Sequence, residues 1–168
     1  GWSGKSTTAA TFSTQFGYTI LADNYALLKG DTLYPFPELP RITRDTEKLL
    51  WIHLDKKADG IKSYLENDTK DTKESYAIDA ICICSYGDVF ELNQITDSEL
   101  SFEQLQSINH YTQEFPEYSN LALLSLLGEY NTGALRADAL REICKKNKIY
   151  SLQNDKNIVS HIPELIAI

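Results

Sequence analysis

The sequence predicts a mixed α/β fold, because segments typical of helices and of strands alternate along its 168 residues. A Gly-Lys-Ser-Thr segment at 4–7 precedes a helical pattern and then an apolar strand that ends at Asp23. An isoleucine-rich run covers 76–84, and two helical patterns enclose a short strand near the C-terminus. We expect a single domain over residues 1–168, with a mixed sheet flanked by helices.

The composition is that of an acidic globular protein. Lys and Arg total 16, and Asp and Glu total 24, which gives a net charge of −8. This charge argues against a nucleic-acid backbone or an anionic membrane as the main partner. No apolar run approaches the length of a membrane span, and the odd number of cysteines, 3, fits a reducing compartment. We therefore expect a cytoplasmic protein.

The first residues have the spacing of a phosphate-binding loop, G-x-x-x-x-G-K-[ST], with Gly4, Lys5 and Ser6 at its last three positions. Backbone N–H groups around Ser3, Gly4 and Lys5 are expected to cradle phosphate oxygens at the positive end of the following helix. Lys5 would reach the β- and γ-phosphates, and the Ser6 hydroxyl would ligate Mg²⁺. Thr7 supplies a second hydroxyl for a phosphate.

The alternative is a chance Gly-Lys-Ser-Thr at an ordinary helix start. The next segments favour the loop: 8–16 suits a buried helix, Gly17 a helix stop, and 18–22 a strand ending in Asp23. The first glycine of the pattern would lie before residue 1, and the chain contains no methionine. We therefore expect a longer product, of which this chain lacks the first strand and the start of the loop.

The next elements are a hairpin and a helix. Residues 25–29 and 32–34 are predicted strands joined at Gly30-Asp31, an order that suits a type II′ turn. Several prolines then predict an extended segment that leads to Arg41. A helical pattern follows over 44–57. The highly charged segment 58–74 is predicted to be an excursion from the fold.

The second half begins with the best candidate for a central strand, 76–84. Within it, Cys82 and Cys84 alternate with isoleucines and should share one face, where we expect core cysteines rather than metal ligands. The further predicted elements are a turn at 86–88, a short strand through Leu92, helices at 96–112, 121–127 and 134–147, a strand at 149–152 and a closing helix at 159–168.

Three polar positions after the loop are candidates for catalysis or phosphate binding. Asp23 would lie at the carboxyl edge of the sheet, where an acid can hold Mg²⁺ or accept the proton of an acceptor hydroxyl. The alternative for Asp23 is a turn residue that starts the hairpin. Arg41 and Arg44 follow the proline-rich segment and could clamp phosphate or an acidic acceptor, with a surface or helix-start role as the alternative.

These residues resemble a known family. G-K-S-T-T-A-A at 4–10 and G-Y-T-I-L-A-D-N-Y at 17–25 look like the kinase domain of HPr kinase/phosphorylase and its relatives. P-E-L-P-R-I at 37–42 resembles the proline-and-arginine segment of HPr-kinase-related proteins, and K-I-Y-S-L at 148–152 resembles their last strand. The remainder matches in the order of elements alone.

The resemblance implies a P-loop fold related to phosphoenolpyruvate carboxykinase and an ATP-dependent protein-serine kinase. By similarity, Gly4, Lys5 and Ser6 bind phosphate and magnesium, and Asp23 is the first acid of the family's Asp-Asp pair. The second acid is Asn24 here, which cannot act as a base and is a weaker Mg²⁺ ligand. This departure weakens the case for phosphorylase chemistry and for HPr as the substrate.

The leading hypothesis is therefore a kinase that uses ATP and Mg²⁺, with Lys5 and Asp23 as catalytic residues and a hydroxyl acceptor. Asn24, Arg41 and Arg44 are candidate substrate or phosphate contacts. One alternative is a small-molecule kinase, although 58–74 is poor in the arginines that its lid would need. The other is a nucleotide-binding regulatory module with weakened catalysis, which Asn24 favours. Because relatives assemble into oligomers, a homo-oligomer is a further expectation.

Overall fold

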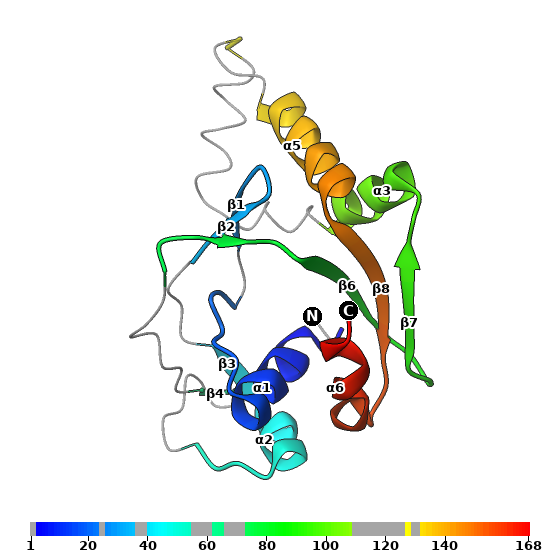
Figure 1. The fold of residues 1–168 in the computed structure, drawn as a ribbon. Helices are drawn as coiled ribbons and strands as arrows, with labels where there is room; N and C mark the ends of the chain where they lie inside the picture. The colour runs from blue at the N-terminus through cyan, green and yellow to red at the C-terminus, as the bar shows by residue number, and fades with distance from the viewer. Residues whose placement is uncertain are drawn as a thin grey trace.

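The computed structural model describes residues 3–23, 26–35, 40–54, 62–65, 73–108, 127–128 and 132–168. Within these ranges helices are combined with parallel and antiparallel strands, which confirms the predicted α/β class. The helices are α1 (Lys5–Phe16), α2 (Arg44–Leu50), α3 (Ser98–Ile108), α5 (Thr132–Lys146) and α6 (Ile158–Ile166). Figure 1 shows α1, α2 and α6 gathered at one end of the molecule and α3 and α5 at the other.

Helix α1 follows the loop directly and ends where the sequence predicts. Gly17 takes a left-handed conformation with φ of 73°, and its N–H donates to the Ser13 carbonyl at 3.2 Å. Residues 18–22, in contrast, form no strand, so the predicted strand before Asp23 is wrong. Ile20 instead packs against a core cluster that includes Ala10 and Ile42. The apolar pattern there reflects packing onto the core rather than pairing with a neighbouring strand.

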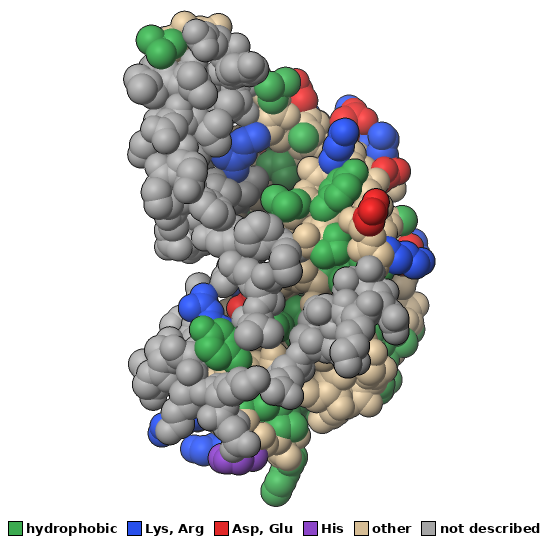
Figure 2. All heavy atoms as spheres, turned by 90° about the vertical axis from the view of Figure 1, so that its left-hand side faces the viewer, with side chains coloured by type: hydrophobic (Ala, Val, Ile, Leu, Met, Phe, Trp, Pro, Cys, Tyr) green, Lys and Arg blue, Asp and Glu red, His purple; other side chains and the backbone are tan. Residues whose placement is uncertain are grey.

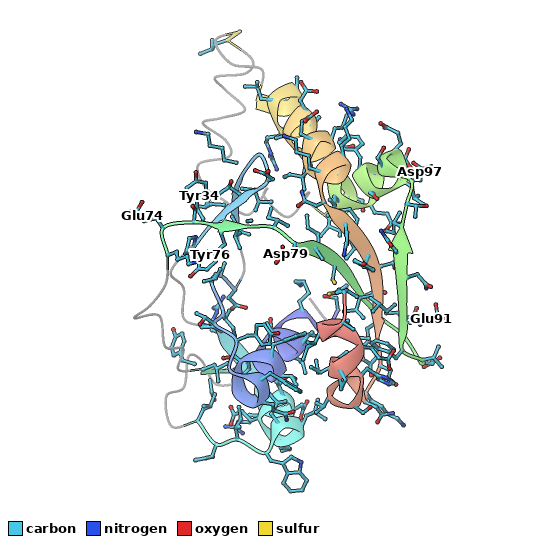
Figure 3. The ribbon with its side chains drawn as sticks, in the orientation of Figure 1. Tyr34, Glu74, Tyr76, Asp79, Glu91 and Asp97 are labelled. Atoms are coloured by element: carbon cyan, nitrogen blue, oxygen red, sulfur yellow. The ribbon has the colours of Figure 1, made fainter. Side chains whose placement is uncertain are left out.

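Strands β1 (Leu27–Lys29), β2 (Thr32–Tyr34) and β5 (Tyr76–Ala77) form a small antiparallel sheet. The predicted hairpin between β1 and β2 is confirmed, with Gly30 at φ of 63° in the turn. A positive φ at Gly30 but not at Asp31 is what a type II′ turn requires. Tyr34 and Tyr76 lie on this sheet, which Figure 3 shows beside the main sheet.

A second small sheet joins β3 (Arg41–Thr43) to β4 (Lys62–Tyr64) in antiparallel register. Strand β4 lies inside the segment 58–74 that was expected to leave the fold, so that expectation is wrong for β4. The reason is burial, because the Ser63 side chain and the neighbouring Leu65 are 5% and 4% exposed. The rest of that segment, up to residue 72, lies outside the described residues.

Helix α2 starts with a Thr43 cap, whose side-chain oxygen accepts a hydrogen bond from the Thr46 N–H. It ends at Trp51, which has a left-handed φ of 56°, so it is shorter than the predicted helix 44–57. The apolar residues beyond it still contribute to the core, because Ile52 and Leu54 pack against the same cluster as Ile20. Their spacing in the sequence is that of a helix, but α2 ends before it reaches them.

The main sheet consists of β6 (Ala80–Tyr86), β8 (Lys148–Asn154) and β7 (Glu91–Ile95), in the order β6-β8-β7. Strand β8 is parallel to β6 and antiparallel to β7. The predicted strand 76–84 is thus divided into β5 and β6, and β8 rather than β6 occupies the centre of this sheet. Two buried residues of β8, Ile149 and Leu152, are each 1% exposed.

One face of the main sheet packs against α6. Leu152 of β8 forms a core cluster with Ile158, Ile162 and Leu165 of that helix, and Cys82 and Cys84 pack against it. Both cysteines are partly buried and pack against the core, which confirms the prediction of core cysteines in part. Helix α1 contacts α6, while α3 contacts α5. None of the helices described in the structure is long and apolar enough to cross a membrane.

The other predicted helices agree with the structure to within a few residues where they are described. Predictions 96–112, 134–147 and 159–168 correspond to α3, α5 and α6. The predicted helix 121–127 lies outside the described residues, except for the turn residue Leu127. On one face of the molecule acidic and basic side chains are interspersed over the described surface (Figure 2). On α5, Arg141 and Asp138 form an ion pair at 3.5 Å with both side chains exposed.

Candidate functional site

The Gly-Lys-Ser-Thr segment lies at the carboxyl edge of the main sheet. Strands β6 and β8 end together at this edge, because Tyr86 is paired with Asn154 in the parallel register. The Asn154 side chain in turn donates from Nδ2 to the Ser3 carbonyl at 2.7 Å. In open α/β sheets, ligands bind beyond the carboxyl ends of the strands. The loop therefore stands where such a fold places a ligand.

Gly4 supplies the backbone conformation that the start of α1 needs. Its φ of 78° lies in the left-handed region, and its carbonyl accepts the Thr8 N–H at 2.9 Å as the first helical bond. A Cβ at Gly4 would lie 2.7 Å from Asn154 Nδ2. Both the left-handed φ and the close approach of Asn154 call for glycine here.

Lys5 is the first residue of α1, and its side chain is exposed. Its ammonium Nζ lies 3.3 Å from Ser3 Oγ, so it folds back over the loop. The positive charge of Lys5 also acts on β6 of the main sheet, where it lowers the pKa of the Cys84 thiol. Burial and the neighbouring Cys82 outweigh that effect and raise the pKa of Cys84 from its ordinary value of 9.0 to about 11. Cys84 is therefore a neutral thiol near neutral pH, and Lys5 is the cation of this loop.

Ser6 and Asp23 are brought together although 17 residues separate them. Ser6 Oγ donates to Asp23 Oδ1 at 3.4 Å, and the Arg41 backbone N–H donates to Asp23 Oδ2 at 3.2 Å. Asp23 thus connects the start of α1 to β3, even though the segment before it is no strand. The two residues expected to serve a magnesium ion are hydrogen-bonded neighbours.

Thr7 faces α2. Its hydroxyl lies 3.0 Å from Thr46 Oγ1, which in turn lies 3.2 Å from Thr43 Oγ1. Thr46 is 7% exposed, so this hydroxyl chain is largely shielded from water. Where the sequence suggested a phosphate contact for Thr7, the structure shows a contact that joins α1 to α2. This series of hydroxyl contacts holds α1 against the segment that carries Arg41 and Arg44.

The two candidate arginines occupy neighbouring elements. Arg41 opens β3 and contributes its backbone N–H to Asp23. Arg44 is the first residue of α2 and is exposed. The Arg41 backbone N–H is part of the site. Neither guanidinium group contacts Asp23 or Lys5 within the described residues. Asn24 lies outside the described residues.

Sequence reasoning missed Asn154, Thr43 and Thr46. Thr43 had a detectable signal, because a threonine before an acidic first helical turn is typical of an N-cap. Asn154 had a weaker one, as a polar residue that ends an apolar strand. Its contact with Ser3, 151 positions away, depends on the parallel pairing of β8 with β6. Local patterns carry no information about such a pairing.

The donors at this site fit a nucleotide phosphate with magnesium. Backbone N–H groups and Lys5 suit phosphate oxygens, and the Ser6 hydroxyl and Asp23 carboxylate are the hard oxygen ligands that Mg²⁺ prefers. Among the described residues, no group of three or more His, Cys, Asp and Glu side chains could hold a metal ion. A magnesium site of this type needs no such group, since water and phosphate supply most of its ligands.

Comparisons with protein-family models, with curated proteins and with solved structures returned no match for this chain. The sequence pattern and the geometry of the loop are therefore what indicate a function for this chain.

Proposed function

We propose that the chain is an ATP-dependent phosphotransferase that resembles HPr serine kinase and transfers the γ-phosphate to a hydroxyl acceptor, most simply a protein serine. The observation that carries this proposal is the hydrogen bond of Ser6 to Asp23 at 3.4 Å, directly beside the start of α1. It joins the hydroxyl of a phosphate-loop pattern to a carboxylate from a distant segment. A chance Gly-Lys-Ser-Thr at a helix start would need no such partner.

In this proposal each side chain has a distinct role. The first backbone N–H groups of α1 and the Lys5 ammonium bind the phosphates and stabilise the charge of the transferred group. The Ser6 hydroxyl and Asp23 carboxylate hold magnesium, which when bound neutralises charge on the β- and γ-phosphates. Asp23 also orients the acceptor hydroxyl and accepts its proton. Arg41 and Arg44, the first residues of β3 and α2, are the candidate contacts for an acceptor or a phosphate.

A second candidate is a nucleotide-binding regulatory module in which transfer is weak. One observation favours it: both Asp23 oxygens accept hydrogen bonds within the protein, from Ser6 and from the Arg41 backbone. These bonds occupy one lone pair on each oxygen and tie the carboxylate to the protein's own structure, which favours a structural role for Asp23. Asn24 in the position of the family's second acid points in the same direction.

The first test measures binding of Mg·ATP and phosphotransfer to serine-containing protein acceptors. Lys5→Ala removes the cation of the loop and is expected to weaken Mg·ATP binding about tenfold or more. Asp23→Asn keeps the shape of the side chain and is expected to lower transfer about 100-fold while nucleotide still binds. Lys48→Ala is the matched control, because Lys48 is an exposed lysine on α2 whose ion pair with Asp45 spans 3.9 Å at the surface.

The outcomes separate the two candidates. Binding without transfer in the unaltered protein would overturn the kinase proposal and leave the regulatory module. Equal Mg·ATP affinity for Lys5→Ala and Lys48→Ala would overturn the assignment of the loop itself.

A further inference from the structure

Asn154 is a buried polar residue whose position is fixed by the main sheet. It is 1% exposed and is the last residue of β8. Its carbonyl accepts the Gly87 N–H at 2.9 Å, and its pairing with Tyr86 sets its register against β6. Burial of an amide costs free energy unless its polar atoms are paired. The role of this side chain therefore lies in what it contacts.

The contact is the backbone of the loop. Asn154 Nδ2 donates to the Ser3 carbonyl at 2.7 Å, a short hydrogen bond. The Ser3 carbonyl oxygen can only accept, so Nδ2 and not Oδ1 must face it. As a consequence Oδ1 is buried without a hydrogen-bond partner among the described residues. An apolar residue of similar size would avoid this unsatisfied atom but would lose the bond to the Ser3 carbonyl, so that bond is what the asparagine provides here.

The bond to Ser3 determines where the next N–H points. In a trans peptide the carbonyl of one residue and the N–H of the next are antiparallel. Because the Ser3 carbonyl is directed at Asn154, the Gly4 N–H is directed away from it. No described residue accepts a hydrogen bond from the Gly4 N–H, while the next carbonyl, that of Gly4, is engaged by Thr8 within α1. The loop therefore presents this N–H on the side opposite the sheet.

We propose that Asn154 is a positioning residue of the phosphate site, which holds the Ser3–Gly4 peptide so that the Gly4 N–H is directed at a phosphate oxygen. This inference rests on the proposed function, and its ligand class is the polyphosphate of a nucleotide. The 2.7 Å bond to Ser3 carries the inference, and the buried Oδ1, which has no hydrogen-bond partner among the described residues, shows that the amide is oriented for that bond. The absence of a Cβ at Gly4 is what allows Asn154 to come so close.

The structure offers a matched control at the other end of the same strand. Asn147, directly before β8, donates from its side-chain Nδ2 to the Ile143 carbonyl at 2.9 Å. Asn147→Ala and Asn154→Ala each remove one amide-to-carbonyl hydrogen bond. Only Asn154→Ala removes one that reaches the loop. If the role of Asn154 were merely structural, any effect on nucleotide binding would follow the loss of stability in both variants.

The experiment measures Mg·ATP affinity and thermal unfolding for the unaltered protein and the variants. Asn154→Ala is expected to bind Mg·ATP about 10- to 100-fold more weakly, because the Gly4 N–H is no longer held towards a phosphate oxygen. A loss of this size is usual when one hydrogen bond to a charged group is removed. Asn147→Ala is expected to stay within about twofold of the unaltered protein. Asn154→Leu serves if the alanine variant does not fold, because it preserves volume and removes the unpaired Oδ1. Weak binding in a leucine variant of unchanged stability excludes a purely structural role.

A second readout distinguishes failure of this inference from failure of the proposed function. The amide resonance of Gly4 is recorded without nucleotide, and it is expected to shift in Asn154→Ala but not in Asn147→Ala. If the unaltered protein does not bind Mg·ATP, the proposed function and with it the phosphate role of Asn154 are overturned, while the Gly4 shift still reports whether Asn154 orients the peptide. Affinity in Asn154→Ala equal to that in Asn147→Ala, or an unmoved Gly4 resonance, would overturn the inference.

Discussion

At the scale of single residues, two glycines with nearly the same backbone conformation bound α1 in different surroundings. Gly4 and Gly17 have φ of 78° and 73°. A Cβ at Gly17 would meet nothing within 4 Å, whereas a Cβ at Gly4 would lie 2.7 Å from Asn154 Nδ2. Alanine substitutions at the two glycines therefore separate the free-energy cost of a left-handed φ from the free-energy cost of displacing Asn154.

We expect Gly17→Ala to lower the free energy of unfolding by about 1 kcal/mol, the usual cost of a left-handed alanine. Gly4→Ala should cost about 1–2 kcal/mol more, because its methyl group must push Asn154 off the Ser3 carbonyl. Mg·ATP affinity should fall in Gly4→Ala and stay unchanged in Gly17→Ala. Urea unfolding and nucleotide titration check both parts. Equal stability losses for the two variants would show that the Asn154 contact is weaker than its geometry indicates.

At the scale of elements, local backbone chemistry predicted the end of α1 and the β1–β2 turn, whereas the strand predicted at 18–22 and the length of the helix predicted at 44–57 were wrong. Gly17 and Gly30 mark the end of α1 and the β1–β2 turn because each takes a positive φ that the sequence can signal. Residues 18–22 had the composition of a strand, but strand formation requires a partner. The same limit applies to the site, where Lys5 and Ser6 are readable from a motif and Asn154 becomes a neighbour only through the β6–β8 register.

The strands are also expected to differ in local stability. Strand β8 is paired on both sides, and it contributes Leu152 to the core. The three residues of β1 are all exposed, and β1 pairs with β2 alone in its sheet. Local opening costs little free energy where few apolar contacts must be broken. The proposed phosphate loop is hydrogen-bonded to β8, which is the more stable of these two strands.

Hydrogen exchange followed by mass spectrometry checks this difference. We expect the amides of 148–154 to be protected close to the free energy of global unfolding and those of 27–34 to exchange at least about 100-fold faster. The Asn154→Ala variant should retain the protection of β8, since its backbone pairing is unchanged. Equal exchange in the two peptides would contradict the view that the main sheet is the stable part.

At the scale of the whole molecule, the chain is acidic, although the site proposed for it would bind an anion. The net charge is −8, and Glu91 and Asp97 lie along the edge strand β7 (Figure 3). Asp97 is occupied in starting α3, since its carboxylate accepts the Glu99 N–H at 2.9 Å. Acidic charge at this edge of the main sheet therefore serves local structure and solubility. The proposed phosphate site would depend on local donors, namely backbone N–H groups and Lys5.

The partly buried thiols of Cys82 and Cys84 give the molecule a defined response to alkaline pH. The Cys84 pKa is raised to about 11 from 9.0, first by burial and then by Cys82, despite the opposing effects of Lys5 and Asn154. Between these values the unfolded thiol loses its proton and the folded thiol keeps it, so the unfolded state binds fewer protons. Stability is therefore full below pH 9 and falls by about 1.4 kcal/mol per pH unit as the pH rises towards 11.

Cys84→Val removes this titration while it keeps an apolar side chain of similar size in the core. We expect the free energy of unfolding of Cys84→Val to fall less steeply between about pH 9 and pH 11 than that of the unaltered protein. Urea unfolding at a series of pH values measures the slope. Ser85→Val, at the neighbouring exposed position, is the control and should keep the original slope. Identical slopes for Cys84→Val and the unaltered protein would mean that the Cys84 thiol is more accessible to water than its packing against α6 indicates.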